Sequence, residues 1–446
     1  MTNEIGKTIN ITSLIDTGKI TQFQVMVIAL CAAVAFLDGI DSQSIAVGAP
    51  LIAAKLALPP GALGPIFSSA LLGGTIGALT FGPLGDKFGR KGILTLATAL
   101  FGVFTFLTAH VTSYENLLAT RFLAGLGLGG ATPCFISLAC EYAPKRWRAR
   151  VASLIWAAFP LGGISGGFLN AFILNTYGWE TMFHLGGVLP LLVSGALLVW
   201  LPESLRFLIA RNAATERVRR IVQRIRPDIE PVNNYVADEE IVHGVPLARL
   251  FTDGRGLPTL LLWVSFFMSF GPLAITVFWL PQLLREYGIG VAQASLLISV
   301  HGIGALIGIA SAGRLIERFG FLPVLLPAFL IGAAVTSSLG YAASSLPATV
   351  VVLFCAGCFV GMAASGSIAL ATLIYPTAIR SSGVGWSMGM GRLGQMFTPL
   401  AAAAMATAGL SGQSIFNVFG IAPLLGAAAV IALRTAMARK SVLATE

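Results

Sequence analysis

Apolar residues occupy this chain in twelve long blocks that are separated by short polar segments. The blocks fall at about 24–52, 63–85, 92–111, 115–140, 150–173, 181–201, 257–284, 292–316, 321–343, 347–374, 381–406 and 413–436. A helix that crosses a bilayer needs about 20 mostly apolar residues, so each block is long enough to span a membrane once. The pattern predicts an all-α membrane protein with twelve transmembrane helices.

The stretch 202–256 interrupts this pattern halfway along the chain. It is polar, rich in Arg, and contains Pro227, Pro231 and Pro246. We interpret it as a central loop with amphipathic pieces on the cytoplasmic side. The expected organisation is an N-terminal six-helix bundle over residues 1–201, the central loop over 202–256, and a C-terminal six-helix bundle over 257–446.

Composition excludes most classes of soluble protein. Of the 446 residues, 56% are hydrophobic and only 11% are charged, whereas a soluble domain has roughly 25% charged residues. The mean hydropathy of +0.84 argues against a cytosolic enzyme, a nucleic-acid binder and a disordered protein. No nucleophile–base set and no cluster of metal-ligand residues is visible, so we expect neither an enzyme nor a bound cofactor or metal.

The positive charges predict which way the helices cross the membrane. If the N-terminus is cytoplasmic, 24 of the 28 Lys and Arg residues lie in inner segments. The outer loops hold only Lys55 and Arg285, and Arg121 and Arg392 remain inside membrane blocks. Cytoplasmic loops of membrane proteins carry an excess of Lys and Arg. Both termini are therefore expected in the cytoplasm.

The two halves of the chain repeat each other. Asp86 and Glu317, which precede the third and ninth blocks, are 231 residues apart. Arg148 and Arg380, which follow the fourth and tenth blocks, are 232 residues apart. Parallel repeats of this kind are typical of two-bundle transporters that bind their substrate between the repeats, near the midplane of the membrane.

The chemical feature that most strongly indicates a function is a pair of carboxylates inside the first apolar block. Asp38 and Asp41 are three residues apart and lie on one face of a helix. Ionisable side chains inside a bilayer usually face a cavity and have a function. Two neighbouring carboxylates in a low dielectric do not easily both stay ionised, which suits a proton carrier. Alternatively, they cap a helix break at Gly39 or lie solvated at the outer mouth.

Three basic side chains inside the membrane blocks are candidates for binding a substrate anion. Arg121 is expected at the same depth as Asp41, so it could pair with an Asp in one state and with substrate in another; the alternative is a fixed structural salt bridge. Arg392, near the midplane, suits a carboxylate through its planar fork, unless it holds a backbone carbonyl or a structural partner. His301 is also near the midplane, where it binds substrate, carries a proton or simply packs.

Charged clusters at the inner helix ends are expected to act as a conformational gate. In the first half they comprise Asp86, Arg90, Glu141 and Arg148, and in the second half Glu317, Arg318 and Arg380. Ion pairs among such residues would hold the inner end closed and break when it opens. The alternative is that these charges only set the topology.

The loop motif at residues 82–91 and Pro202-Glu203-Ser204 resemble motifs of the major facilitator superfamily. More narrowly, the chain resembles the aromatic acid:proton symporter family, which includes benzoate, 4-hydroxybenzoate and protocatechuate transporters. This resemblance rests on Asp38-Gly-Ile-Asp41, on 121–130, on 375–386 and on Gly391-Arg392-Leu-Gly394.

The resemblance implies an importer of an aromatic carboxylate by proton symport, acting as a monomer in the bacterial inner membrane. Trp386 is a further candidate for contact with an aromatic substrate. A proton-coupled transporter of another organic anion or metabolite, and an exporter of the same fold, remain alternatives.

Overall fold

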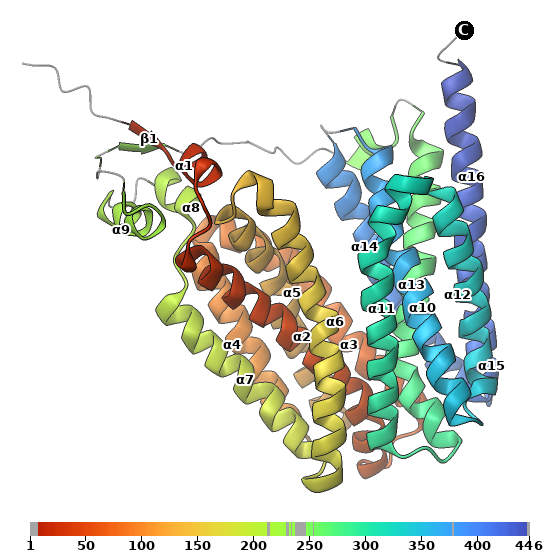
Figure 1. Cartoon of the computed structure of the whole chain (residues 1–446). Helices are drawn as coiled ribbons and strands as arrows, with labels where there is room; N and C mark the ends of the chain where they lie inside the picture. The colour runs from red at the N-terminus through yellow and green to blue at the C-terminus, as the bar shows by residue number, and fades with distance from the viewer. Residues whose placement is uncertain are drawn as a thin grey trace, which may run out of the picture.

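Long helices make up nearly all of the computed structural model (Figure 1). It describes residues 8–211, 215–228, 232, 234–236, 247–252, 254–376 and 379–443. The first half holds α2 (Gln22–Lys55), η1 (Pro60–Ala62), α3 (Leu63–Phe88), α4 (Arg90–Thr108), α5 (Tyr114–Glu141), α6 (Lys145–Thr176) and α7 (Trp179–Trp200). The second half holds α10 (Gly256–Glu286), α11 (Val291–Phe319), α12 (Leu322–Ala342), α13 (Leu346–Ile374), α14 (Arg380–Thr407), α15 (Gly412–Phe419) and α16 (Ile421–Leu443).

The helix boundaries follow from local chemistry that the two halves share. Helix α2 begins with a capping box, in which Thr21 and Gln24 satisfy each other's free backbone N–H groups. Gly89, between α3 and α4, and Gly320, between α11 and α12, both have positive φ angles, of 104° and 83°. Only glycine adopts such a conformation at little cost. The two glycines are 231 residues apart, so the sequence repeat is also a structural repeat.

Eleven helical segments in the described residues are long and apolar enough to cross a membrane. Helix α14 is not among them, because it is rich in Gly and Ser and contains Arg392. It is nevertheless 28 residues long and packs between α10 and α3. With α14 the arrangement is the twelve-helix one, which confirms the predicted fold class.

The last predicted span is present, as the apolar helical segment Gly412–Ala436. Helix α15 ends at Phe419 and α16 begins at Ile421, and Gly420 between them keeps helical backbone angles, with φ −64° and ψ −20°. A side chain on Gly420 would collide with Ser337 of α12, so α12 approaches the span closely at this glycine.

The outer surface of the bundles is apolar, as a protein in lipid requires. Large hydrophobic side chains such as Leu79, Phe172, Leu192, Val199 and Val351 are more than 60% exposed. Patches of this extent are rare on soluble monomers. Such exposed apolar patches are stable when they face the hydrocarbon tails of a lipid bilayer.

The central stretch holds short elements that pack on both halves. The elements α8 (Leu205–Ala210), α9 (Thr215–Ile225) and β2 (Asn234–Val236) pack on the first half, whereas η2 (Leu247–Leu250) packs on the second, where Leu250 is buried with Leu262 and Phe266. The N-terminal segment adds β1 (Thr8–Asn10) and α1 (Ile11–Thr17), and β1 pairs in parallel with β2, with Thr8 opposite Asn234. The predicted amphipathic pieces are therefore present, but no sequence pattern indicates that they pair with the N-terminal segment.

The two halves meet at one end and diverge toward the end that carries both termini (Figure 1). The contacts run between α6 and α11, between α3 and α14, and between α2 and α10. At this closed end Phe67 stacks on Phe278 at 5.1 Å. Buried residues of both halves, including Ile45, Trp279 and Ile298, form one apolar cluster there.

Candidate functional site

The two carboxylates of α2 lie in different surroundings. Asp41 is only 4% exposed, whereas Asp38 is half-buried. Both oxygens of Asp41 lie 3.2 Å from Nη1 of Arg121 on α5, and the Arg121 side chain is fully buried. Asp41 and Arg121 therefore lie at the same level of the bundle, as expected from the sequence. Asp41 rather than Asp38 is the partner of Arg121.

Thr105 of α4 completes this buried pair. Its hydroxyl donates to Asp41 Oδ1 at 3.1 Å and accepts a hydrogen bond from Arg121 Nη2, also at 3.1 Å. The Arg121 guanidinium lies 5.7 Å from the ring centroid of Phe183 on α7. If either partner of a buried ion pair loses its charge, the charge of the other partner is left buried without compensation. A proton on Asp41 would therefore change the whole cluster.

Arg392 links the two bundles near the midplane. It lies on α14, and its Nη1 donates to the backbone carbonyl of Gly74 on α3 at 3.3 Å. Asp38 on α2 and Arg392 form no direct ion pair in the described part of the chain. Asp38 lies one helical turn before Asp41 on the same helix.

The structure does not bring Trp386 to the same place as Arg392. Six residues separate them on α14, which is about 9 Å along the helix axis. Trp386 is 47% exposed and stacks on Trp263 of α10 with ring centroids 6.3 Å apart. His301 on α11 is buried, and its Nε2 has no hydrogen-bond partner among the described residues. The substrate-binding roles of both side chains stay predictions.

The predicted gate residues of the first half form a connected network. Glu141 at the end of α5 accepts hydrogen bonds from Arg90 Nη1 at 3.0 Å, from the Ser204 hydroxyl at 2.8 Å and from the Arg206 backbone N–H at 2.9 Å. Arg90 also binds Asp86 at 3.0 Å. None of these residues belongs to the second half, so the network is intact while the halves diverge at this end.

Arg148, the fourth predicted gate residue of the first half, binds outside that network. Its Nη2 lies 2.9 Å from Asp16 Oδ1 on α1. The same carboxylate oxygen accepts a hydrogen bond from the Lys145 backbone N–H at the start of α6, at 2.8 Å. Arg148 therefore holds the N-terminal helix against the bundle.

The predicted gate residues of the second half repeat only part of this arrangement. Arg380 Nε donates to the Tyr375 carbonyl at 3.3 Å, as Arg148 Nε donates to the Ala143 carbonyl at 3.2 Å. Within the described ranges, however, Glu317, Arg318 and Arg380 form no ion pair; the Arg318 guanidinium lies over the ring of Phe319. The position that corresponds to Glu141 is Leu373, so the central acid of the network is missing.

Several polar side chains at the closed end were not predicted from the sequence. Gln43 of α2 donates to the Ser295 carbonyl of α11 at 3.3 Å, across the two halves. One residue further on, Ser44 exchanges hydrogen bonds with Asn170 of α6 at 3.1 and 3.3 Å. The sequence does contain a signal for such contacts. A Gln or Asn inside an apolar block indicates a hydrogen bond to another helix, because an unpaired amide in the membrane is costly.

Replacing Glu141 with Gln is expected to destabilise the first half, because Arg90 loses its buried anion. A hydrogen bond to a charged group contributes about 1.5–3 kcal/mol. The matched control is Asp86→Asn, since Asp86 is 67% exposed and Glu141 only 5%; an exposed pair contributes at most about 1 kcal/mol. Thermal unfolding of the purified protein in detergent should show a clearly lower Tm for Glu141→Gln alone. Equal losses in both variants would contradict this assignment.

The chain is similar to membrane transporters over almost its whole length. Residues 59–440 match the family described as "Sugar (and other) transporter". The 4-hydroxybenzoate transporter PcaK of Pseudomonas putida is 33% identical over 432 residues, which are 96% of each chain. The gallate transporter of Pseudomonas putida is 31% identical over 425 residues, or 95% of each chain.

The fold is similar to that of solved transporters. The crystal structure of a D-xylose-proton symporter superimposes with a TM-score of 0.73 at 22% identity, covering 92% of this chain and 97% of that one. At this identity the likeness shows the fold alone. Together with the family match, it shows that the chain belongs to the sugar (and other) transporter family of the major facilitator superfamily, and that it is a multi-pass membrane transporter and not an enzyme.

Proposed function

We propose that this protein imports an aromatic carboxylate together with a proton across the bacterial inner membrane. The names of two relatives refer to 4-hydroxybenzoate and gallate, which are both hydroxylated benzoic acids with one carboxylate. The observation that carries the proposal is the buried Asp41–Arg121 ion pair inside the first bundle. Arg392, on α14 of the second bundle, adds a cation at the contact between the bundles, where it donates to the Gly74 carbonyl.

This arrangement supports a simple coupling of substrate to proton. In the structure, Asp41 balances the charge of Arg121. A proton on Asp41 removes that balance and leaves an excess of positive charge between the bundles, and Arg392 then binds the substrate carboxylate through its planar fork. Asp38 lies one helical turn from Asp41, so it would serve as a second proton acceptor. His301 would bind a ring hydroxyl. Trp386, about 9 Å from Arg392 along α14, would contact only the end of the ring that lies farthest from the carboxylate.

Transport would proceed by rocking of the two bundles, residues 1–201 and 257–446, about the site between them. By the excess of Lys and Arg, the divergent end and both termini would lie in the cytoplasm. The structure would then correspond to an inward-facing conformation. On return to the outward-facing state, the network of Asp86, Arg90 and Glu141 would meet the inner ends of the second bundle. The proposed transport unit is a monomer.

Replacing Gly167 with Val is expected to open the outer end. A side chain on Gly167 of α6 would collide with Ser299 of α11, so the halves could not close there. A cysteine placed at the buried position Ile298 should then react several-fold faster with a membrane-impermeant thiol reagent. The matched control is Gly195→Val on α7, where an added side chain meets nothing within 4 Å. Equal reactivity in all three proteins would contradict the placement of the closed contact.

Uptake by cells without their own aromatic acid transporters tests the proposed substrate class. Labelled 4-hydroxybenzoate, gallate and benzoate should enter cells that express this protein, and xylose or an aliphatic acid should not. Efflux of preloaded aromatic acid against its gradient would favour the exporter instead. Uptake of aliphatic acids alone would indicate another organic anion as substrate.

A further inference from the structure

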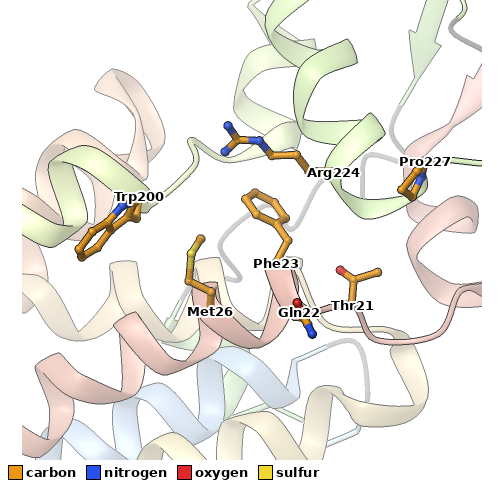
Figure 2. Close-up of a pocket in the computed structure, with 7 residues that line it drawn as sticks. All are labelled: Thr21, Gln22, Phe23, Met26, Trp200, Arg224 and Pro227. Carbon is orange, nitrogen blue, oxygen red and sulfur yellow. The ribbon is translucent and has the colours of Figure 1, made fainter.

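A groove lies outside the transport pathway, where α2 begins, α7 ends and α9 packs against the start of α2 (Figure 2). Its volume is about 480 Å³, within the range of pockets for small ligands. Phe23 and Met26 of α2, Trp200 of α7 and Arg224 of α9 line it. The groove thus combines an apolar wall from the membrane helices with a cation from the central loop.

The apolar wall continues into the lipid-facing surface of the first bundle. Val25 of α2 and Leu198, Val199 and Trp200 at the end of α7 are all more than half exposed. Tryptophan is enriched where a membrane meets water. Trp200 therefore marks the level of the lipid headgroups, and the groove opens at that level.

Helix α9 supplies positive charge on the opposite wall. Val218, Val222 and Ile225 bury its apolar face, while Arg217, Arg220 and Arg224 are exposed. This pattern is typical of an amphipathic helix that packs its apolar face on a protein core and presents its charged face outward. It positions several cations just above the exposed band of the bundle.

Arg224 is the cation of α9 that faces the groove. Its guanidinium lies 5.7 Å from the ring centroid of Phe23. Among the described residues Arg224 has no acidic partner, whereas Arg219 and Arg226 on either side bind Glu216 and Asp228. Within the described residues, the groove therefore presents a cation without an acidic partner beside the start of α2.

We propose that this groove binds an anionic phospholipid of the adjoining leaflet. The phosphate binds Arg224, the glycerol part lies over Phe23, and the acyl chains follow Met26 and Trp200 onto the exposed surface of the bundle. A bound lipid would join α9, and with it the central loop, to the ends of α2 and α7. This site is independent of the proposed substrate and of proton coupling.

The test is thermal unfolding of the full-length protein in neutral detergent with added lipid. A ligand that binds only the folded protein raises its apparent stability. Phosphatidylglycerol should raise the Tm of the parent protein more than phosphatidylcholine does. The Arg224→Gln variant should lose at least half of that difference. Arg217→Gln removes the same charge from the same helix but outside the groove. This variant should keep the full difference in Tm between the two lipids.

Native mass spectrometry of the same proteins counts the lipids that stay bound. The parent and Arg217→Gln should retain one more phosphatidylglycerol than Arg224→Gln. Equal losses in both variants would show diffuse attraction to basic α9 and overturn the proposal. An equal rise in Tm with glycerol phosphate or inorganic phosphate would identify a site for a soluble anion, which also overturns it. An equal rise in Tm with phosphatidylglycerol and phosphatidylcholine would also overturn the proposal.

Discussion

Replacing Asp41 with Asn is expected to abolish accumulation of substrate while leaving exchange of substrate across the membrane. An amide cannot take up and release a proton, and it leaves the fully buried Arg121 without its anion. For a monoanion carried with one proton, two pH units support about 100-fold accumulation, because each unit is worth about 1.36 kcal/mol. The variant should reach only equal concentrations inside and outside reconstituted vesicles.

Asp228→Asn is the matched control for this prediction. It is the same chemical change at an exposed carboxylate that binds Arg226 in the central stretch, and it should accumulate substrate normally. Asp38→Asn is expected to resemble Asp41→Asn or to be milder. Normal accumulation in the double variant of Asp38 and Asp41, at normal amounts of protein, would refute the role of these carboxylates in carrying the proton.

Replacing Arg392 with Ala is expected to remove most of the affinity for the aromatic acid. Truncating one partner of a buried charge pair costs on the order of 2–5 kcal/mol, and Arg392 is the cation of α14 between the bundles. Arg392→Lys keeps the charge but loses the planar fork, so the apparent KM should rise while the pH dependence is kept. Calorimetric binding to the purified protein measures the loss, and the neutral amide of the same acid should lose little.

Arg285→Gln controls for the loss of a cation that connects the bundles. Arg285 Nη1 donates to the Pro50 carbonyl across the closed end at 3.1 Å, as Arg392 donates to the Gly74 carbonyl near the midplane. The control variant should bind the acid as the parent does. If Arg392→Ala also binds it as tightly as the parent, the anchor lies elsewhere, and Arg121 and His301 become the candidates.

The helices were the part of the fold most accessible from the sequence. Membrane spans are long and continuous, so an apolar block such as 24–52 identifies α2 (Gln22–Lys55) to within a few residues. Block 381–406 was also predicted, although α14 is too polar to pass as a span by composition. Helices inside a bundle face other helices rather than lipid, so small and polar residues are tolerated there.

The candidate site was only partly accessible from the sequence. The depth of a residue in the membrane can be calculated from its position along a straight helix. This calculation predicted that Arg121 pairs with an Asp of the first block. It did not distinguish Asp38 from Asp41, because both lie on one face of α2 and only rotation of the helix against α4 and α5 decides. Thr105 was missed for a related reason: most Thr hydroxyls in these helices bond their own backbone, as Thr98 does.

Contacts between distant short segments were not accessible at all. Asp16 binds Arg148 across 132 residues, and the three-residue strands β1 and β2 pair across the whole first half. Neither strand has the length or the alternating pattern that predicts a strand. The partners of Glu317, Arg318 and Arg380 were assumed from the repeat, but the second half lacks an acid that corresponds to Glu141.

Substrate-driven proton movement in reconstituted vesicles tests the central claim most directly. Vesicles hold the purified protein, an internal pH dye and no membrane potential. Adding 4-hydroxybenzoate outside should acidify the interior at the rate of substrate entry, and an imposed pH gradient, acid outside, should drive accumulation of about tenfold per unit. Asp41→Asn should show neither effect. Substrate entry without acidification, or accumulation that ignores the pH gradient, would contradict proton symport through this site.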